Sequence, residues 1–167
     1  MHIRKRIRKI HIEKRMIITI CGISELNNIL HEKDFEHIVC FLDPPHGSEA
    51  TTTTKQHHKL LRSFTKNIHT IFCKDIRGSK NTSPDAPSFG TIDKLVKIAN
   101  TICEGDHVLI HCTQGISRST AGAMILLMTK GHTQEEAYTM VRKTRSVAHP
   151  NDRMLRLYET LSRSTVG

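Results

Sequence analysis

Apolar and polar segments alternate along the chain in the rhythm of strands and helices that follow one another. Short continuous apolar runs rich in β-branched residues have the composition of strands that are buried on both faces of a sheet. Four such runs lie at residues 16–21, 37–42, 68–73 and 107–111. The pattern therefore predicts one α/β domain with a mainly parallel central sheet of about four strands, flanked by helices in a three-layer α/β/α arrangement.

Helices are predicted between and after these strands from apolar spacing and from residues that favour helix ends. We expect them from Ser24 towards residue 31, at about 55–65, at 89–102, at 118–130, from Thr133 and from Pro150. The segment 118–130 is apolar on nearly every side, which predicts a buried, central helix. Residues 51–54 are predicted to form a polar loop. The segment 75–88, rich in Gly, Pro, Ser and Asn, predicts a long loop of the kind that is often functional.

The composition narrows the class of protein. Of the 167 residues, 37% are hydrophobic and 25% are charged, which suits one globular core. The longest apolar stretch, 16–23, is far shorter than the roughly 20 residues that span a bilayer, and it lacks a signal-peptide cleavage pattern, so we expect a cytoplasmic protein. Five cysteines without repeated spacing argue against a disulfide framework, and the scattered histidines, His57 and His58 among them, show no metal-ligand spacing. We therefore expect neither a metal nor a cofactor.

The net charge of +9 is concentrated at the N-terminus. Residues 1–15 contain seven basic side chains and one acidic side chain, which give about two thirds of that net charge. We therefore divide the chain into a basic arm (1–15) and a domain (16–167). The arm has no aromatic residue for base stacking, which favours a solvated, partly disordered terminus. The alternative is an arm that contacts anionic surfaces such as nucleic acid or lipid.

The segment 110–120 joins the fourth predicted strand to the central helix and carries the candidate chemistry. Cys112 ends the strand and Arg118 begins the helix. Ligand sites of parallel sheets lie beyond the carboxyl ends of the strands, and a helix N-terminus offers free N–H groups with partial positive charge. Gly115 allows the intervening residues to curve with their N–H groups pointing inward. The segment therefore predicts a loop that holds a tetrahedral dianion.

The same surroundings make Cys112 a candidate nucleophile. A free thiol has a pKa of about 8.5, so only a small fraction is thiolate at neutral pH. The helix N-terminus, the inward amides and Arg118 all favour the thiolate. Arg118 also offers a planar fork that matches two phosphate oxygens, and the Ser119 hydroxyl can donate to the sulfur when it departs. These residue types predict a phosphatase that works through a cysteinyl-phosphate intermediate rather than an ordinary buried thiol.

The sequence HCTQGISRS at 111–119 resembles the HC-x5-R signature loop of the protein tyrosine phosphatase superfamily. Its SRS ending is closer to the dual-specificity branch, and the run GISRSTA is similar to that of small bacterial tyrosine phosphatase-like proteins. The resemblance extends from about Met16 to the end of the chain and includes Pro150 and Asn151 before the last helix. At Gln114 the family often has alanine or an acidic residue, which bears on pocket depth and substrate preference. The implied phosphate-binding loop contains, besides Cys112 and Arg118, His111, Thr113, Gln114, Gly115, Ile116 and Ser117.

Phosphoryl transfer to a thiolate also needs a carboxylic acid that protonates the departing oxygen. The resemblance places this acid soon after the third strand, at Asp75, and Asp85 in the same long loop is the alternative. Asp43 lies at the same edge of the sheet, but its place before two prolines is typical of a strand-ending turn. A metal is not needed for this mechanism.

Two other cysteines end strands at the edge that carries Cys112. Cys21 and Cys73 are each candidates to trap an oxidised Cys112 as a disulfide. The alternative is that they pack as ordinary buried thiols, which is common in short apolar strands.

Three functions agree with these residues. The first is a phosphomonoester hydrolase, a protein-tyrosine or dual-specificity phosphatase whose partner is a phosphorylated protein or peptide. The second is the same chemistry on a phosphoinositide or an RNA 5′-phosphate; inositide-directed relatives usually carry lysines in the loop, whereas residues 113–117 are uncharged. The third is a phosphate-binding module without catalysis, against which the intact Cys112, Arg118 and Ser119 argue. We expect the loop to bind a phosphate or sulfate ion.

Overall fold

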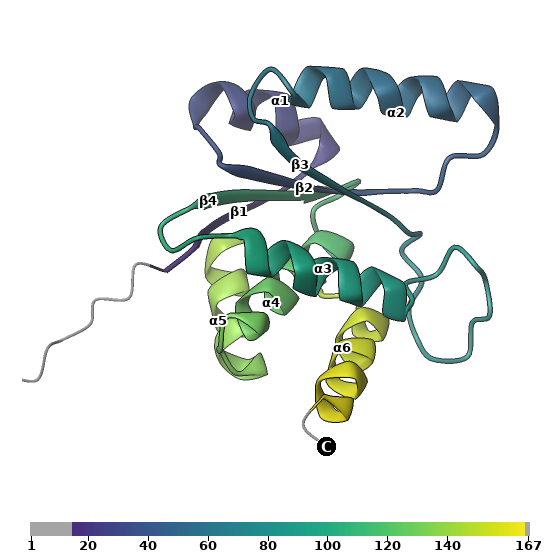
Figure 1. The fold of residues 1–167 in the computed structure, drawn as a ribbon, viewed down its shortest axis with the longest axis vertical. Helices are drawn as coiled ribbons and strands as arrows, with labels where there is room; N and C mark the ends of the chain where they lie inside the picture. The colour runs from purple at the N-terminus through teal and green to yellow at the C-terminus, as the bar shows by residue number, and fades with distance from the viewer. Residues whose placement is uncertain (1–14, 166–167) are drawn as a thin grey trace, which may run out of the picture.

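The computed structural model describes residues 15–165, in which four strands and six helices follow each other (Figure 1). The strands are β1 (Ile17–Gly22), β2 (His37–Leu42), β3 (Asn67–Phe72) and β4 (His107–Cys112). The helices are α1 (Ile23–Glu32), α2 (Gly47–Leu61), α3 (Phe89–Thr101), α4 (Arg118–Thr129), α5 (Gln134–Thr144) and α6 (Asp152–Ser164). The predicted arm lies almost entirely outside the described residues.

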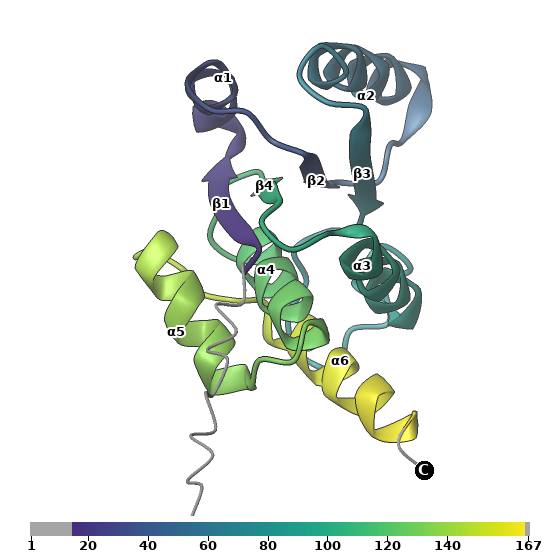
Figure 2. The same cartoon turned by 60° about the vertical axis from the view of Figure 1, so that its left-hand side comes forward.

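The four strands form one parallel sheet in the order β1-β4-β2-β3, so that β4 lies between β1 and β2. Helices α1 and α2 cover one face, and α3, α4, α5 and α6 cover the other (Figure 2). Side chains alternate between the faces along each strand. In β4, Ile110 and Cys112 belong to the core beneath α3–α6, whereas Leu109 belongs to the core beneath α1. The predicted three-layer α/β/α domain with a parallel sheet is confirmed.

Helix α4 positions the end of β4 and is buried along most of its length, as its apolar composition predicts. It lies so close to the sheet that a Cβ on Gly122 would come within 2.6 Å of the Phe41 ring. The following turn has the expected caps, because Gly131 has a φ of +104° and the Thr133 side chain accepts a hydrogen bond from the Glu136 amide. Helix α4 begins at Arg118, so its N-terminus follows the carboxyl end of β4 at Cys112.

The predicted loop over residues 51–54 is wrong, and the helix predicted over about 55–65 exists but has other bounds. Helix α2 begins at Gly47, includes residues 51–54 and ends at Leu61. A helix is recognised in a sequence by its apolar stripe, and the described side chains of α2 have almost none. The long loop predicted at 75–88 is confirmed, because no helix or strand lies between β3 and α3. No helix in the range 15–165 is both long enough and apolar enough to cross a membrane.

Candidate active site

The residues that join β4 to α4 form a tight loop around the sulfur of Cys112. Gly115 has a φ of +70°, and its N–H donates to Sγ over 3.2 Å. A Cβ at this position would lie 2.5 Å from the carbonyl carbon of Cys21, because the end of β1 presses against the loop. Both the conformation and the space therefore require glycine here.

Every carbonyl group of residues 113–117 is bound from outside the loop. Backbone amides bind three of them: the amide of Ile23 binds the Thr113 carbonyl, that of His149 binds Ile116, and that of Asn151 binds Ser117. The guanidinium of Arg145 binds the other two, the carbonyls of Gln114 and Gly115, each over 3.1 Å. The C=O and N–H of one trans peptide group point in opposite directions, so a carbonyl that points out of the loop directs the N–H of the same peptide group into it. The loop thus has the inward amides of an anion-binding concavity, next to the positive end of α4.

Arg145 itself is fixed by a bidentate ion pair with Glu25, with N–O distances of 2.6 and 2.8 Å. The hydrogen bond from Arg145 is the main reason why the pKa of Glu25 lies below its usual value. Glu25 also accepts a hydrogen bond from the Gly22 amide at the start of α1. This pair links α1 to the residue that follows α5, across the outside of the loop. Sequence reasoning missed both residues because they are distant along the chain.

The thiol of Cys112 is nearly buried, yet its pKa is lowered from the ordinary value. Burial alone raises the pKa, but this effect is outweighed by the hydroxyl and amide of Ser119, the amide of Gly115 and the charge of Arg118. The Ser119 hydroxyl oxygen lies 3.1 Å from Sγ. Burial without such donors has the opposite result: it raises the pKa of Cys21 and of Cys73 to about 12. Among these three thiols, the surroundings favour the thiolate at Cys112.

Arg118 is buried at the first position of α4, with its side chain 5% exposed. One terminal nitrogen donates to the Asp43 carboxylate and to the Cys73 carbonyl, both over 2.7 Å, and the other donates to the Thr113 hydroxyl over 3.1 Å. The Nε atom has no hydrogen-bond partner among the described residues. The guanidinium is therefore held in one orientation at the floor of the site, with a donor left for an anion.

Asp75 lies beside the loop, directly after β3. Its carboxylate accepts hydrogen bonds from the Ser117 hydroxyl and, over 2.8 Å, from the Asn151 side-chain amide. Asn151 also caps α6 through the amide of Met154, so the start of the last helix positions this carboxylate. Arg77 donates to the same Ser117 hydroxyl over 3.0 Å. These contacts orient Asp75 toward the loop.

Asp85, the alternative acid, is bound elsewhere. Its carboxylate pairs with Lys74 at 3.2 Å and with His46 at 3.3 Å. The hydrogen bond from Lys74 is the first cause of its lowered pKa, with a further contribution from His46. Asp85 is also absent from the residues that line the cavity above Cys112. The geometry thus separates the two candidates that the sequence left open.

A cavity of about 580 Å³ opens above the loop. Seven of the predicted site residues line it: Asp75, Cys112, Thr113, Gln114, Ile116, Ser117 and Arg118. Ser119 lies behind the sulfur and Gly115 contributes its amide. The side chain of His111 lies elsewhere, against His57. The cavity is also lined by Asp43, Lys74, Ile76 and Arg77, whose roles the sequence did not predict.

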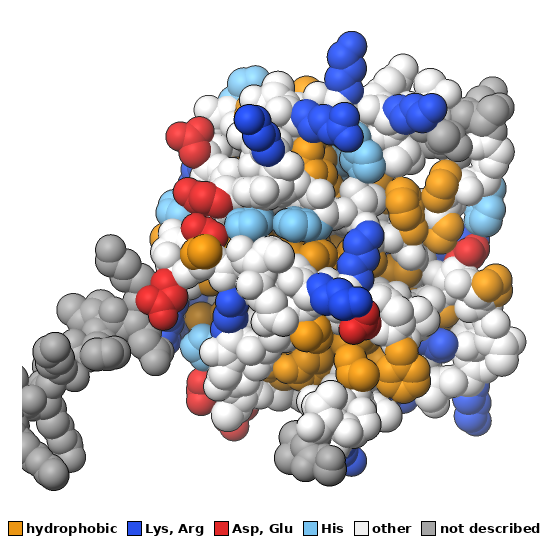
Figure 3. Space-filling model, viewed as in Figure 1, with side chains coloured by type: hydrophobic (Ala, Val, Ile, Leu, Met, Phe, Trp, Pro, Cys, Tyr) orange, Lys and Arg blue, Asp and Glu red, His pale blue; other side chains and the backbone are white. Residues whose placement is uncertain are grey.

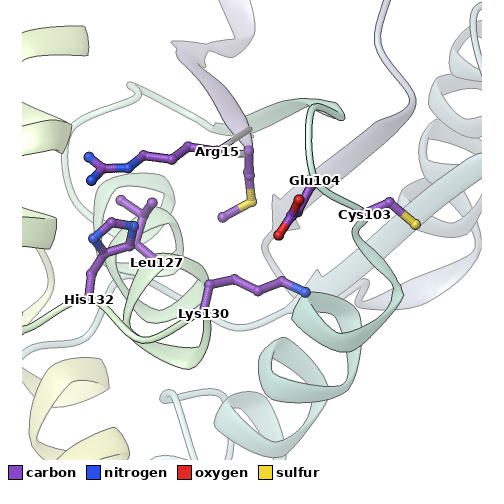
Figure 4. Close-up of a pocket in the computed structure, with 7 residues that line it drawn as sticks. Arg15, Cys103, Glu104, Leu127, Lys130 and His132 are labelled. Carbon is purple, nitrogen blue, oxygen red and sulfur yellow. The ribbon is translucent and has the colours of Figure 1, made fainter. Parts of the chain in front are cut away.

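A second cavity, of about 200 Å³, lies at the other end of the domain, where β1 starts and α4 ends (Figure 4). Lys130 lines it and donates to the Ile102 carbonyl over 2.8 Å. Its cysteine, Cys103, is exposed and follows the C-terminus of α3. The predicted site residues Cys112 and Arg118 line the larger cavity and not this one.

Known proteins resemble this chain in sequence and in fold. A Dictyostelium discoideum protein named "Probable rhodanese domain-containing dual specificity protein phosphatase" is 34% identical over 87 residues, which are 51% of this chain and 18% of the relative. The chain thus spans about a fifth of that relative's length. Two solved structures share the fold: Cydia pomonella PTP-2 phosphatase, with a TM-score of 0.60 at 19% identity over 86% of this chain and 84% of that one, and human DUSP28, with a TM-score of 0.59 at 14% identity over 89% and 92%.

A protein-family model matches most of the chain. The model for "Dual specificity phosphatase, catalytic domain" matches residues 25–161, from α1 into α6. The resemblance predicted from residues 111–119 is thereby confirmed. Because the match takes in β2, β3 and β4, the loop around Cys112 and the start of the helix that positions Asp75, the chain belongs to the family of dual specificity phosphatase catalytic domains.

Proposed function

We propose that this chain is a protein-tyrosine or dual-specificity phosphatase that hydrolyses phosphomonoesters through a cysteinyl-phosphate intermediate. The observation that carries the proposal is the sulfur of Cys112, which accepts a hydrogen bond from the Gly115 amide, lies 3.1 Å from the Ser119 hydroxyl oxygen and lines a 580 Å³ cavity together with Arg118. Membership of the family supports the same activity. The loop amides and Arg118 would bind the phosphate dianion, as they would bind a free phosphate or sulfate ion.

In the first step the thiolate of Cys112 attacks phosphorus and the phosphorus–oxygen bond of the ester breaks. Asp75 acts as the general acid and gives a proton to the departing oxygen. The products are the free alcohol or phenol, the phosphorylated sulfur and the Asp75 carboxylate. Asp75 suits this role because it lines the cavity and is oriented by Ser117 and Asn151.

In the second step water attacks the phosphorylated sulfur. The Asp75 carboxylate takes a proton from that water, inorganic phosphate forms, and the bonding electrons return to the sulfur of Cys112. The Ser119 hydroxyl stabilises the departing thiolate through its hydrogen bond. Asp75 therefore serves as acid in the first step and as base in the second, and Ser119 stabilises the sulfur when it leaves.

The surroundings of the cavity support phosphorylated proteins or peptides as substrates. Lys74 and Arg77 are among the residues that line it, while residues 113–117 of the loop carry no charge. This arrangement suits one phosphate in the loop and acidic groups near the entrance. All five cysteines are free, and the mechanism needs a reduced Cys112. We therefore propose a reducing compartment, the cytoplasm.

The activity is tested by hydrolysis of para-nitrophenyl phosphate with the wild-type chain and with Cys112→Ser. We expect turnover that is abolished in the variant, and the absence of turnover in the wild type would leave a phosphate-binding module. Phosphotyrosine and phosphothreonine peptides would then be compared with a phosphoinositide and an RNA 5′-phosphate. Higher kcat/KM for either of the last two would replace the protein substrate in this proposal.

A further inference from the structure

A second cluster of reactive side chains lies on the other side of β4 from Cys112. Cys40 in β2 and His111 in β4 are register partners in the sheet, and His57 reaches them from α2. The Nε2 atoms of His57 and His111 are 3.2 Å apart, and the sulfur of Cys40 lies within 4.8 Å of both imidazoles' nearest nitrogens. Cys40 and His111 are fully buried and His57 is half-buried.

The helix that supplies His57 has too little apolar surface to explain its place on the sheet. A helix that covers a sheet normally presents an apolar stripe at spacings of three and four residues. In α2 the positions of this stripe hold Thr54, His57, His58 and Leu61, and only Leu61 is buried among the described side chains of the helix. The outer face carries exposed lysines, and Figure 3 shows basic side chains over α2 at the top of that view. The inner face is thus built largely from imidazoles.

The distances agree with one metal ion between the three side chains. Tetrahedral zinc binds imidazole nitrogens at about 2.0–2.1 Å, which places two such nitrogens about 3.3 Å apart. The 3.2 Å between the hydrogen-bonded nitrogens of His57 and His111 also matches that edge, and the Cys40 sulfur lies within 4.8 Å of both, so zinc would draw the three side chains closer together. One thiolate and two imidazoles suit zinc and exclude magnesium and calcium, which prefer oxygen ligands.

We propose that Cys40, His57 and His111 form a zinc-binding site that fixes α2 to the sheet. Three protein ligands leave the fourth tetrahedral position for water, which can reach the site on the half-exposed side of His57. The ion joins β2, β4 and α2, and its ligand in β4, His111, is the residue that precedes Cys112. The site is independent of the proposed phosphatase activity, because no group of the cavity is a ligand.

Zinc binding would change the protonation of one of the three ligands. Burial is the main cause that lowers the pKa of His111 to about 4, and burial also lowers the pKa of His57, so both imidazoles are neutral near pH 7. Burial raises the pKa of the Cys40 thiol to about 12. Zinc binding therefore displaces one proton from Cys40: the sulfur–hydrogen bond is exchanged for a sulfur–zinc bond and the proton goes to solvent.

The site is tested with the full-length Cys112→Ser chain, in which the catalytic sulfur cannot be counted as a metal ligand. The purified protein is titrated with Zn²⁺ alone, and with Co²⁺ as a spectroscopic substitute. We expect one ion per chain and a cobalt spectrum with a thiolate charge-transfer band and tetrahedral d–d bands. Cys40→Ala should remove the thiolate band, and His57→Ala should weaken zinc binding by more than the roughly 100-fold typical of lost second-shell contacts.

His58→Ala is the matched control. His58 is the next residue of α2 and donates to or accepts from the Thr70 hydroxyl over 2.6 Å, so its loss disturbs the same helix without removing a ligand. We expect this variant to keep the cobalt spectrum and to gain thermal stability with zinc, as the parent does, whereas His57→Ala gains none. Circular dichroism of the metal-free variants shows that each is folded. Stoichiometric binding that survives both Cys40→Ala and His57→Ala, or no binding by the parent, would overturn the proposal.

Discussion

Replacing Ser119 with alanine removes the hydroxyl that lies 3.1 Å from the sulfur of Cys112. Ser119 is fully buried, and its side chain is the largest of the influences that lower the pKa of this thiol. A hydrogen bond to a charged group is worth about 1.5–3 kcal/mol, so its loss reduces the ratio of thiolate to thiol by about 10- to 100-fold at a given pH. The amides of Gly115 and Ser119 and the charge of Arg118 remain in the variant.

The measurement is the rate at which iodoacetate alkylates Cys112 as a function of pH. Because the pKa of the native thiol is depressed, thiolate is present above that pKa and is lost as the pH falls through it; Ser119→Ala moves this transition to higher pH. The sulfur also becomes a poorer leaving group, so we expect the phosphorylated sulfur to accumulate and a burst of phenol to precede slower turnover of para-nitrophenyl phosphate.

A matched control removes another serine hydroxyl from a helix N-terminus. Ser88 caps α3 by accepting a hydrogen bond from the Thr91 amide, and its hydroxyl makes no contact with the loop around Cys112. Ser88→Ala should lower stability by about 1 kcal/mol and leave the alkylation profile in place. An unchanged profile in Ser119→Ala, or the same displacement in both variants, would refute the view that this hydroxyl stabilises the thiolate.

Three further predictions concern the acid and the loop. Asp75→Asn should slow turnover about 10²–10⁴-fold on substrates with poor leaving groups and far less on para-nitrophenyl phosphate. The control Asp85→Asn should change neither rate. Equal losses on both substrates in Asp75→Asn would exclude Asp75 as the acid. Arg145→Ala frees two loop carbonyls and should lower kcat/KM about tenfold or more, whereas Arg142→Ala, which loses only a bond to Ala148, should not. Gly115→Ala, at a φ of +70° and 2.5 Å from backbone, should lower the melting temperature by several degrees and abolish turnover.

The sequence predicts most of the fold because the local signals agree with the packing. The strands are short runs rich in apolar and β-branched residues, and α4 is apolar along most of its length because it is buried in the centre of its layer. The failure at α2 has a physical cause. Its inner stripe consists of Thr54, His57, His58 and Leu61, so the helical period is carried by polar residues and cannot be seen as a hydrophobic pattern.

In the candidate site, too, the sequence predicts the residues that are close together in the chain and misses the contacts between distant ones. Cys112, Gly115, Arg118 and Ser119 are recognisable because a strand end, a tight loop and a helix N-terminus are consecutive in the chain, so their spacing encodes their geometry. Asp43 lies 75 residues from Arg118 in sequence and His111 lies 54 residues from His57, yet both pairs are in contact. The parallel sheet brings Asp43, which follows β2, to the edge that carries Arg118, and the packing of α2 on the sheet brings His57 to His111.

The electrostatics of Cys112 depend on this long-range part as much as on the signature residues. Inward N–H groups stabilise a thiolate only if the carbonyls of the same peptides are satisfied elsewhere, because an unpaired buried carbonyl costs about 1–3 kcal/mol. Residues 22–25, 145 and 149–151 supply those partners from three separate places in the chain. The loop can therefore hold its anion-binding shape only when α1 and the segment from α5 to α6 have docked against it. Since the HC-x5-R pattern specifies none of these partners, a chain that keeps the signature but loses the docking would keep the nucleophile and lose the conditions that ionise it.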